Sequence, residues 1–440
     1  MSSQKIVRLP KEDEVFSGAL FIVRKLKEQG FDAFIVGGAV RDIVMGTVPS
    51  EYDIATSATP HDVQRLFRHV VPVGIKYGVV KVRLRRNGRW LEYEVATFRR
   101  DLRYLDGRRP EGVVFAGIEE DVLRRDFTVN GLVLDPESGV VLDMVGGLED
   151  IENKVIRAIG SPLERFEEDK LRPLRAIRFA CKLGFRIDDS LMDALKACAH
   201  EVACVSKERV RDELRKMLLS ARGDVGLRLM HETGLLPYCL ERFEGMGSHE
   251  IEETARALSE VSRMGIEGKK KDHHYEIVLW ATLLFCLGSN GALDQMIALK
   301  HPNKMSSAVA EAVACAYKAK ALPFGDIAKE KRLLRHEHAP NGVVVLKAFL
   351  KVRGEPLTPA EYAEQRLGEW RKEDLFPQRL ATGEDALKAG IRPGKDVGHA
   401  LRLVEDEVLR GNIRDREGAL RFIEEIAKKA TDASFSQNKT

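Results

Sequence analysis

Hydrophobic and polar positions alternate in several short runs within residues 1–150, a pattern typical of half-buried β-strands. The clearest runs are residues 31–38, 52–56, 77–84, 91–98 and 131–135. Between these runs, residues 12–29 and 61–67 carry apolar residues at helical spacing. The pattern predicts an α/β domain built on a mixed sheet.

The pattern changes after about Ile151, where apolar residues recur every three or four positions. This spacing predicts helices at residues 169–185, 209–221 and 224–236 and an all-helical remainder. Gly and Pro at residues 392–398 predict a loop, and the polar residues 431–440 predict a frayed end.

The composition fits a soluble globular protein, with 44% hydrophobic and 32% charged residues. A chain of 440 residues is long enough for two to four domains. The net charge of +3 is too small to indicate a polyanionic partner, although local basic patches can be balanced by acidic ones.

The six cysteines form no CxxC pair and lack the spacing of zinc ligands, so we expect reduced thiols in a cytosolic protein. The N-terminus is polar and predicts no signal peptide. The longest apolar run, residues 277–288, is too short to span a bilayer. We interpret it as a core helix and expect no membrane partner and a cytoplasmic location.

Two carboxylates, Glu51 and Asp53, flank Tyr52 at the start of a predicted strand. Residues two apart on a strand point the same way, so the like charges repel and a divalent metal is the obvious ligand between them. Taken alone, such a pair is more often a solvated strand edge. The interpretation changes because the strand at residues 91–98 offers two more acids, Glu92 and Glu94.

A glutamate in an apolar strand is costly unless it is paired or bound to a metal. Three acids meeting on one sheet face could bind two Mg²⁺ ions about 3.5–4 Å apart, an arrangement that serves in-line phosphoryl transfer. Upstream, a strand runs through Gly37 and Gly38 into a helix carrying Arg41. Backbone N–H groups at such a turn suit a triphosphate, although a plain strand-to-helix turn is the commoner explanation.

Residues 37–67 closely resemble the core of class II tRNA nucleotidyltransferases (CCA-adding enzymes) and bacterial poly(A) polymerases. The family pattern is G-G-x-V-R-D, then D-x-D-[IV]-x-T, and the matching stretches here are GGAVRD and EYDIAT. The resemblance continues in order through residues 74–82, 94–101, 104–110, 123–132 and 167–185. It is strong from Ile35 to about Leu236 and weak beyond.

The resemblance implies a nucleotidyltransferase head at residues 1–150, a helical neck at 151–225, a helical body at 226–370 and an RNA-binding tail at 371–440. It makes Glu51 and Asp53 the ligands of Mg²⁺ and Glu94 the acid that helps to activate the RNA 3′-hydroxyl. The nucleotide-binding residues that it implies are Gly37, Gly38, Arg41, Arg125, Asp169, Arg172, Arg175 and Arg178.

Asp169 and Arg172 are three residues apart, so on a helix they would share one face, which Arg175 and Arg178 continue. A row of this kind is often a solvated face with ion pairs. A carboxylate beside a guanidinium also offers the acceptors and donors needed to imitate a base edge. The resemblance assigns selection of CTP or ATP to Asp169 and Arg172, while Arg175 and Arg178 help to hold the triphosphate.

The chain departs from the family at two positions. Glu51 stands where Asp is usual, and Pro173 stands where an aliphatic residue is usual. Because proline clashes with the carbonyl four residues before it, either the helix begins no earlier than about Asp169 or it bends at Pro173. These departures keep open a catalytically inert RNA-binding module.

Three activities share this core, namely full CCA addition, partial addition and poly(A) synthesis. Residues 99–115 match the loop that CC-only enzymes shorten, and residues 380–413 resemble the tail of long CCA-type enzymes. We therefore expect addition of CCA or of its terminal A to tRNA from CTP and ATP, with poly(A) polymerase as the alternative. The basic residues 268–274 and 331–338 are candidate phosphate contacts.

Residues 273–289 have the shape of a phosphohydrolase (HD-type) helix, but Phe285 and Cys286 replace its paired His and Asp. We expect no phosphohydrolase activity there, and we expect His273 and His274 to be surface residues.

Overall fold

The computed structural model describes residues 3–101, 112–264 and 273–437. The chain divides into two compact units, Met1–Ser248 and His249–Thr440, each taken by itself below. This division does not test the boundaries expected for head, neck, body and tail, which stay predictions. Most of the loop expected at residues 99–115, and most of the basic stretch 268–274, lies outside the described residues.

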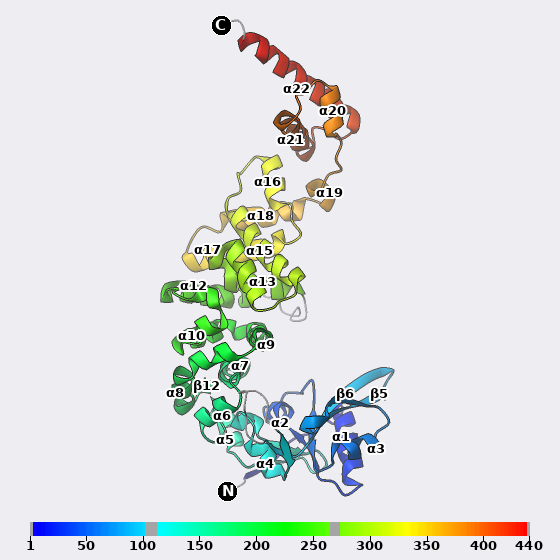
Figure 1. Ribbon diagram of the computed structural model, residues 1–440, viewed down its shortest axis with the longest axis vertical. Coiled ribbons are helices and arrows are strands. Elements are labelled where there is room, and N and C mark those ends of the chain that lie inside the picture. The colour runs from blue at the N-terminus through cyan, green and yellow to red at the C-terminus, as the bar shows by residue number, and fades with distance from the viewer. Residues whose placement is uncertain (1–2, 102–111, 265–272, 438–440) are drawn as a thin grey trace. The chain divides into compact units, whose positions relative to one another are not determined.

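An eight-stranded mixed sheet forms the head of the first unit (Figure 1). Strands β3 and β6 run parallel, and the other neighbouring pairs run antiparallel. In spatial order the strands are β1 (Ser3–Ile6), β10 (Val140–Asp143), β9 (Val133–Asp135), β2 (Ala33–Val36), β3 (Asp53–Thr56), β6 (Arg89–Thr97), β5 (Val79–Arg86) and β4 (Val70–Gly74).

All five predicted strands are confirmed, as β2, β3, β5, β6 and β9. The alternation pattern missed β1, β4 and β10. Strand β4 contains Pro72, which cannot donate to a ladder, and it occupies the sheet edge where such a residue is tolerated.

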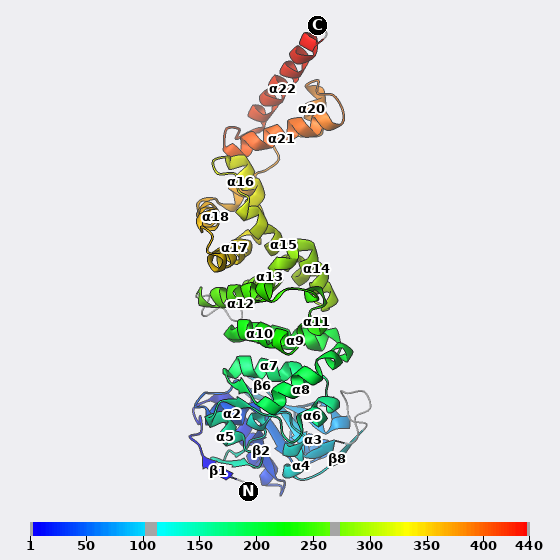
Figure 2. The same cartoon turned by 90° about the vertical axis from the view of Figure 1, so that its left-hand side faces the viewer.

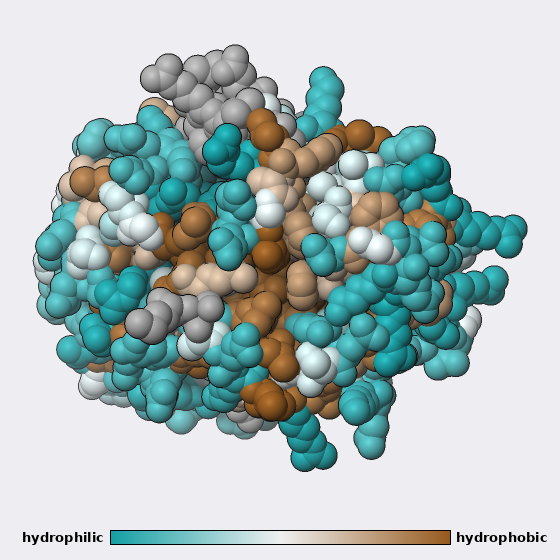
Figure 3. Space-filling model, turned by 90° about the horizontal axis from the view of Figure 1, so that it is seen from below, coloured by the Kyte–Doolittle hydropathy of each residue, from teal (hydrophilic) through white to brown (hydrophobic). Residues whose placement is uncertain are grey.

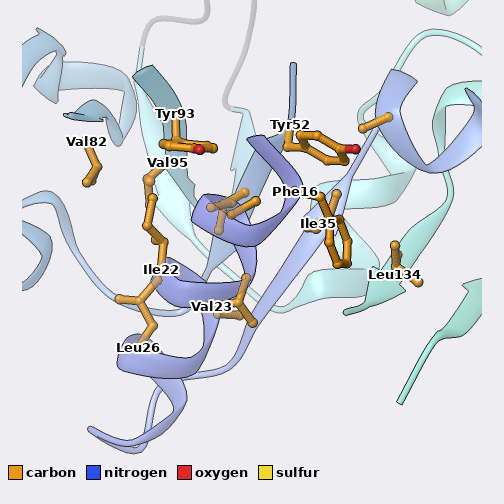
Figure 4. Packing of buried hydrophobic residues seen from close by; sticks show 14 of the residues in the cluster. Phe16, Ile22, Val23, Leu26, Ile35, Tyr52, Val82, Tyr93, Val95 and Leu134 are labelled. Carbon is orange, nitrogen blue, oxygen red and sulfur yellow. The ribbon is translucent and has the colours of Figure 1, made fainter. Parts of the chain in front are cut away.

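One face of the sheet packs against helix α1 (Glu14–Lys27), the first predicted helix. Phe16, Ile22 and Leu26 of α1 are fully buried against strand residues that include Ile35 and Val95 (Figure 4). Burial of each such side chain contributes about 1.5–3 kcal/mol, so α1 fixes this face of the sheet as the core face.

Shorter helices complete the head. They are α2 (Gly38–Val44), α3 (Pro60–Leu66), α4 (Ile118–Leu123) and α5 (Gly147–Glu152), with the 3₁₀ turn η2 (Thr128–Asn130). Two small ladders pair β7 (Arg99–Asp101) with β8 (Val113–Phe115) and β11 (Val155–Ile156) with β12 (Arg186–Ile187). Figure 3 views the head from the side away from α7 and shows hydrophobic residues gathered in the middle of that face.

Helices α6 to α11 continue the first unit, and they stack beside the sheet in both cartoon views (Figures 1 and 2). Their bounds are α6 (Pro162–Glu168), α7 (Arg172–Leu183), α8 (Asp189–Ala197), α9 (Lys207–Met217), α10 (Gly223–Glu232) and α11 (Leu236–Cys239). A π-helical turn, η4 (Leu218–Arg222), joins α9 to α10. Helix α7 begins at Arg172, so Pro173 lies in its first turn and does not bend it.

The second unit is helical throughout its described part. It contains most of α12 (Ser248–Arg263), then α13 (His273–Leu284), α14 (Gly288–Ala298), α15 (Asn303–Lys320), α16 (Ile327–Leu334), α17 (Ala339–Arg353), α18 (Thr358–Glu369), α19 (Lys372–Leu375), α20 (Gly383–Lys388), α21 (Lys395–Arg410) and α22 (Arg416–Gln437). A separate small core joins α20, α21 and α22.

Two predictions about the C-terminal part were only partly right, because only residues 392–394 of the expected loop precede α21 and residues 438–440 lie outside the described residues. The segment at residues 392–398, expected as a loop, already enters α21 at Lys395, and α22 continues through residues expected to be frayed. Gly394 supplies the φ of +100° that precedes α21, so Gly and Pro here mark a helix start.

The stretch His273–Ala298 is long and apolar enough to cross a membrane by length and composition, and 56% of its most apolar part is buried. Helix α13 buries every residue from Ile277 to Leu284. This burial agrees with the core helix expected from the sequence. His273 and His274 at the start of α13 are exposed, as expected.

Candidate active site

A cavity of about 850 Å³ lies between the sheet and the helices α7 and α9 of the first unit. Its lining includes all the site residues that the family resemblance implied, namely Gly37, Gly38, Arg41, Glu51, Asp53, Glu94, Arg125, Asp169, Arg172, Arg175 and Arg178, but not Glu92, the other candidate acid of the same strand. The fold therefore brings segments from five sequence motifs to one place, while the individual roles stay predictions.

The acids Asp53 and Glu94 lie at matching positions on neighbouring strands. Strands β3 and β6 are parallel, with Ile54 opposite Val95, and the two acids each precede one of this pair. Because Ile54 and Val95 are buried in the core on the α1 side, Asp53 and Glu94 face the other side of the sheet. They share one face, as the sequence predicted.

Tyr52 holds the chain in place between the two acids of the E-x-D pair. Its side chain is buried on the core side, packs edge-on against Phe16 at 5.6 Å, and donates a hydrogen bond to Asp13 Oδ2 at 3.0 Å. Strand β3 begins only at Asp53, so Glu51 precedes the strand and approaches the cavity from a loop.

The carboxylates repel one another. The pKa of Asp53 is raised to about 6, mainly by burial and then by the charges of Glu94 and Glu51, while Arg125 acts in the opposite direction. This wall of the cavity therefore has an excess of negative charge that a divalent cation would relieve.

Within residues 3–101, 112–264 and 273–437, no group of three or more His, Cys, Asp and Glu side chains is arranged to hold a metal ion. Glu51 and Asp53 still fit Mg²⁺, because this ion is commonly held by one or two carboxylates, with water and substrate phosphates completing its shell.

The Gly37–Gly38 turn brings backbone close to the acids. Gly37 has a φ of +75°, and a Cβ there would lie 3.2 Å from Arg125 Nη1 and 4.0 Å from Asp53 Oδ2. Only glycine allows both this conformation and this close approach. Arg125 is held by Asp121, whose carboxylate lies 2.9 Å from Nη2, and its buried Nε lacks a partner among the described residues.

Arg41 is more buried than the sequence suggested, with only 1% of its surface exposed. It donates to Asp42 Oδ1 from Nε at 2.9 Å and to Asn130 Oδ1 from Nη1 at 2.6 Å. Asn130 also donates to Asp126, which accepts two hydrogen bonds from Arg175. Arg41 thus supports the glycine turn and connects α2 to α7 through polar contacts.

Helix α7 carries a partly buried row of basic residues into the cavity. Burial lowers the pKa of Arg175, but the neighbouring Asp126 carboxylate raises it by more, so the pKa of Arg175 is raised overall. Arg178 donates to the buried Glu213 of α9. The ring of Phe179 lies 3.9 Å from the Arg178 guanidinium and 5.5 Å from that of Arg175, so it holds two guanidiniums in position.

The expected pairing of Asp169 with Arg172 on one helix face was wrong. Asp169 follows the last residue of α6 in an extended conformation and Arg172 begins α7, so the two do not lie on one helix. Asp169 instead accepts a hydrogen bond from Arg209 at 2.7 Å, and Arg172 donates to Glu168 and to the carbonyl of Arg124. Pro173 explains why the two residues do not share a helix. Proline favours the first turn of a helix, so α7 begins at Arg172, after Asp169.

Sequence reasoning missed several charged, polar and aromatic residues of the cavity lining, namely Arg99, Arg124, Asp126, Asn130, Phe179, Lys182 and Lys216. Burial and the charge of Arg41 lower the pKa of Lys182, which shows how closely the cations are gathered. Asp126 and Asn130 stand in the stretch LRRDFTVNGL, but nothing in its spacing predicts contacts with α2 and α7.

Comparison with known proteins agrees with this geometry. The family described as poly A polymerase head domain matches residues 33–157, and the one described as probable RNA and SrmB-binding site of polymerase A matches residues 184–245. The CCA-adding enzyme of Ligilactobacillus salivarius is 31% identical over 418 residues, covering 91% of this chain and 94% of that enzyme. The chain belongs to the CCA-adding enzyme family.

Other members of the CCA-adding enzyme family give the same result. The Limosilactobacillus fermentum enzyme is 32% identical over 431 residues, covering 96% of this chain and all of that enzyme. The crystal structure of the Bacillus stearothermophilus CCA-adding enzyme in complex with CTP superposes with a TM-score of 0.75 at 29% identity, covering 96% of this chain and 100% of that one. The mixed-sheet head and helical remainder expected from the sequence are thus confirmed.

Proposed function

We propose that the protein is a template-independent RNA nucleotidyltransferase that adds CCA, or its terminal A, to tRNA 3′ ends from CTP and ATP. The observation that carries this function is the position of Asp53 beside Glu94 on the sheet, in the same cavity as the basic row of α7. Family membership supports the same activity, since the curated relatives are CCA-adding enzymes over more than nine-tenths of the chain.

In this reaction the RNA 3′-hydroxyl attacks the α-phosphate of the nucleotide and pyrophosphate leaves. Glu94 faces the cavity and is suited to orient the hydroxyl and accept its proton. Arg125 and Arg175 supply fixed positive charge for the triphosphate, and their ion pairs with Asp121 and Asp126 hold them in position before the substrate binds.

We infer that Mg²⁺ is the divalent ion and that Glu51 and Asp53 hold it. When bound, it would neutralise charge on the phosphates and on the attacking oxygen. The raised pKa of Asp53 supports this assignment, because a buried carboxylate that lies beside two other acids gains most from a cation.

We infer that Asp169 and Arg172 select the base, although not as a pair on one helix. Asp169 offers acceptors and Arg172 offers donors, and both line the cavity. Arg209 holds the carboxylate of Asp169, so side chains from the residue after α6, from α7 and from α9 meet at this wall.

The two alternatives receive less support. Poly(A) synthesis shares the head, but the full-length relatives are CCA-adding enzymes rather than poly(A) polymerases. An inert module is disfavoured because Glu51 still lines the cavity and Pro173 leaves α7 straight.

The deciding experiment incubates the protein with Mg²⁺, labelled CTP or ATP, and tRNAs ending before each of their three last nucleotides. Incorporation of C and then A supports full addition, and incorporation of A alone supports a terminal-A enzyme. Long A tails on unrelated RNA would point to poly(A) synthesis, and no incorporation into any RNA would contradict the proposal.

We propose that this activity takes place in the cytoplasm, because free thiols are typical of proteins in a reducing compartment. All six cysteines are free, and burial raises the pKa of Cys181 and of Cys239 to about 12, so these two thiols are unreactive.

A further inference from the structure

The β5–β6 hairpin carries a row of side chains on the same sheet face as Glu94. In the antiparallel register, Lys81 lies opposite Glu94, Arg83 opposite Glu92, and Arg85 opposite Trp90. Residues directly opposite one another share a face, and so do residues two apart. We call this set the hairpin row: Lys81, Arg83, Arg85, Trp90 and Glu92.

The hairpin row leads outward from the cavity. The intervening residues Val82, Tyr93 and Val95 are buried in the core on the α1 side, which confirms that the row faces away from it. Trp90 lies four residues from Glu94 along β6, or about 13 Å at the usual strand rise. A strand of a few nucleotides spans this distance. Figure 1 shows this end of the hairpin extending beyond the rest of the sheet.

Trp90 is exposed over 43% of its surface, although tryptophan is among the largest apolar side chains. The Arg83 guanidinium lies over its ring at 5.0 Å, and His69 contacts it edge-on at 4.9 Å. An exposed aromatic ring beside cationic side chains is an arrangement with which proteins stack unpaired bases.

The charge of the row is positive. Glu92 lies 3.4 Å from Lys81 and 3.2 Å from Arg83, so a single carboxylate forms ion pairs with two cations and neutralises only one of the two charges. Arg85 is exposed and makes no ion pair with any residue that the structure describes. Such an excess of guanidinium and ammonium groups beside an aromatic ring suits a phosphodiester strand.

We propose that the hairpin row binds the RNA strand immediately upstream of its 3′ end, with Trp90 stacking on a base and Arg83 and Arg85 contacting phosphates. This inference rests on the proposed function, because it takes the 3′ end to lie at Glu94. It names a binding surface outside the cavity itself, whose lining includes Glu94 but neither Glu92 nor Trp90.

The test measures the affinity for a tRNA lacking its terminal CCA as a function of salt concentration. Log affinity falls as log salt concentration rises. Replacing Arg83 and Arg85 by Gln should make this fall shallower, with a slope smaller in magnitude by about 0.7 for each phosphate that the variant no longer binds. The KM for CTP should stay unchanged. If the double variant does not fold, the single variant Arg85→Gln replaces it, since Arg85 makes no ion pair within the described part of the chain.

The hairpin offers a matched control. Arg86 and Arg89 lie opposite each other at the same end of the hairpin but on the other sheet face, where Arg86 lies over the ring of Phe21. Replacing Arg86 and Arg89 by Gln removes the same charge, and the slope should remain that of the wild type. Equal slopes for the two double variants, whether both match the wild type or both are shallower, would overturn the inference.

A second measurement reports on Trp90. Trp90→Ala should weaken RNA binding about tenfold or more, while Trp90→Phe keeps a stacking ring and restores most of the affinity. Equal affinity of all three proteins would overturn the stacking role. Binding is measured without catalysis. A wild type that binds this RNA but incorporates no nucleotide would contradict the proposed function, and the binding data for the hairpin variants could still be interpreted.

Discussion

Arg209 on α9 donates a hydrogen bond to Asp169 Oδ2 at 2.7 Å, across the wall of the cavity. The other oxygen of Asp169 accepts from the backbone N–H of Leu171. The carboxylate is therefore held from two sides by groups that the sequence pattern did not associate with it. Its orientation depends on the packing of α9 against α7.

Arg209→Met should loosen nucleotide choice. A charge-assisted hydrogen bond contributes about 1.5–3 kcal/mol, so losing its orienting effect should change the ratio of kcat/KM for CTP and ATP by about tenfold. Steady-state kinetics with each nucleotide measure this ratio. Arg211→Met on the same helix, where the arginine pairs with Asp212, serves as the control and should leave the ratio unchanged.

Asp53→Asn should abolish nucleotide incorporation while the fold persists. The carboxylate is the proposed metal ligand at the start of β3, and an amide of the same shape lacks its charge. We expect a loss of at least about a hundredfold in kcat, measured with labelled CTP. Glu137→Gln, in an exposed turn beside Arg24 and Lys27, should keep near-normal rates. A near-normal rate for Asp53→Asn would show that the metal assignment is wrong.

The stability of the metal-free protein should fall as pH rises from about 4 to above 6. The pKa of Asp53 is raised from 3.8 in the unfolded chain to about 6 in the fold, mainly by burial and then by Glu94. The folded state therefore binds the proton more tightly in this window, and stability decreases as the proton is lost.

Thermal unfolding in the presence of a chelator, followed across this pH range, measures the effect. Asp53→Asn should show a smaller decrease than the wild type. Adding Mg²⁺ should raise the melting temperature of the wild type near pH 8 and change that of the variant less. Identical pH profiles for the two proteins would contradict the electrostatic account.

Glu213→Ala should destabilise the first unit strongly. Glu213 and Arg178 are 3% and 8% exposed and bind each other between α9 and α7. Removing one partner leaves a buried charge, which costs about 3–5 kcal/mol. Chemical denaturation measures the change. Combining Glu213→Leu with Arg178→Met should recover much of the loss, because it removes both charges together.

The sequence predicted the sheet face that carries Asp53 and Glu94 more completely than it predicted the contacts around it. Alternation in residues 91–98 placed Glu94 on a strand face, and E-x-D placed Asp53 at a strand start, so their common orientation followed from strand geometry. The Arg41–Asn130 hydrogen bond joins residues 89 positions apart. No local pattern encodes such a contact, because it depends on how α2 and η2 pack together.

The sequence by itself determined the order of the motifs, the class of each domain and the chemistry that paired acids and a basic helix can perform, because periodicity and residue type are local properties of the chain. The tertiary structure alone decided that β3 and β6 are neighbours, that Asp169 meets Arg209 and that Arg41 is buried. Those relationships arise from the packing of distant segments, whose burial and ion pairing set the final geometry and the protonation of the site.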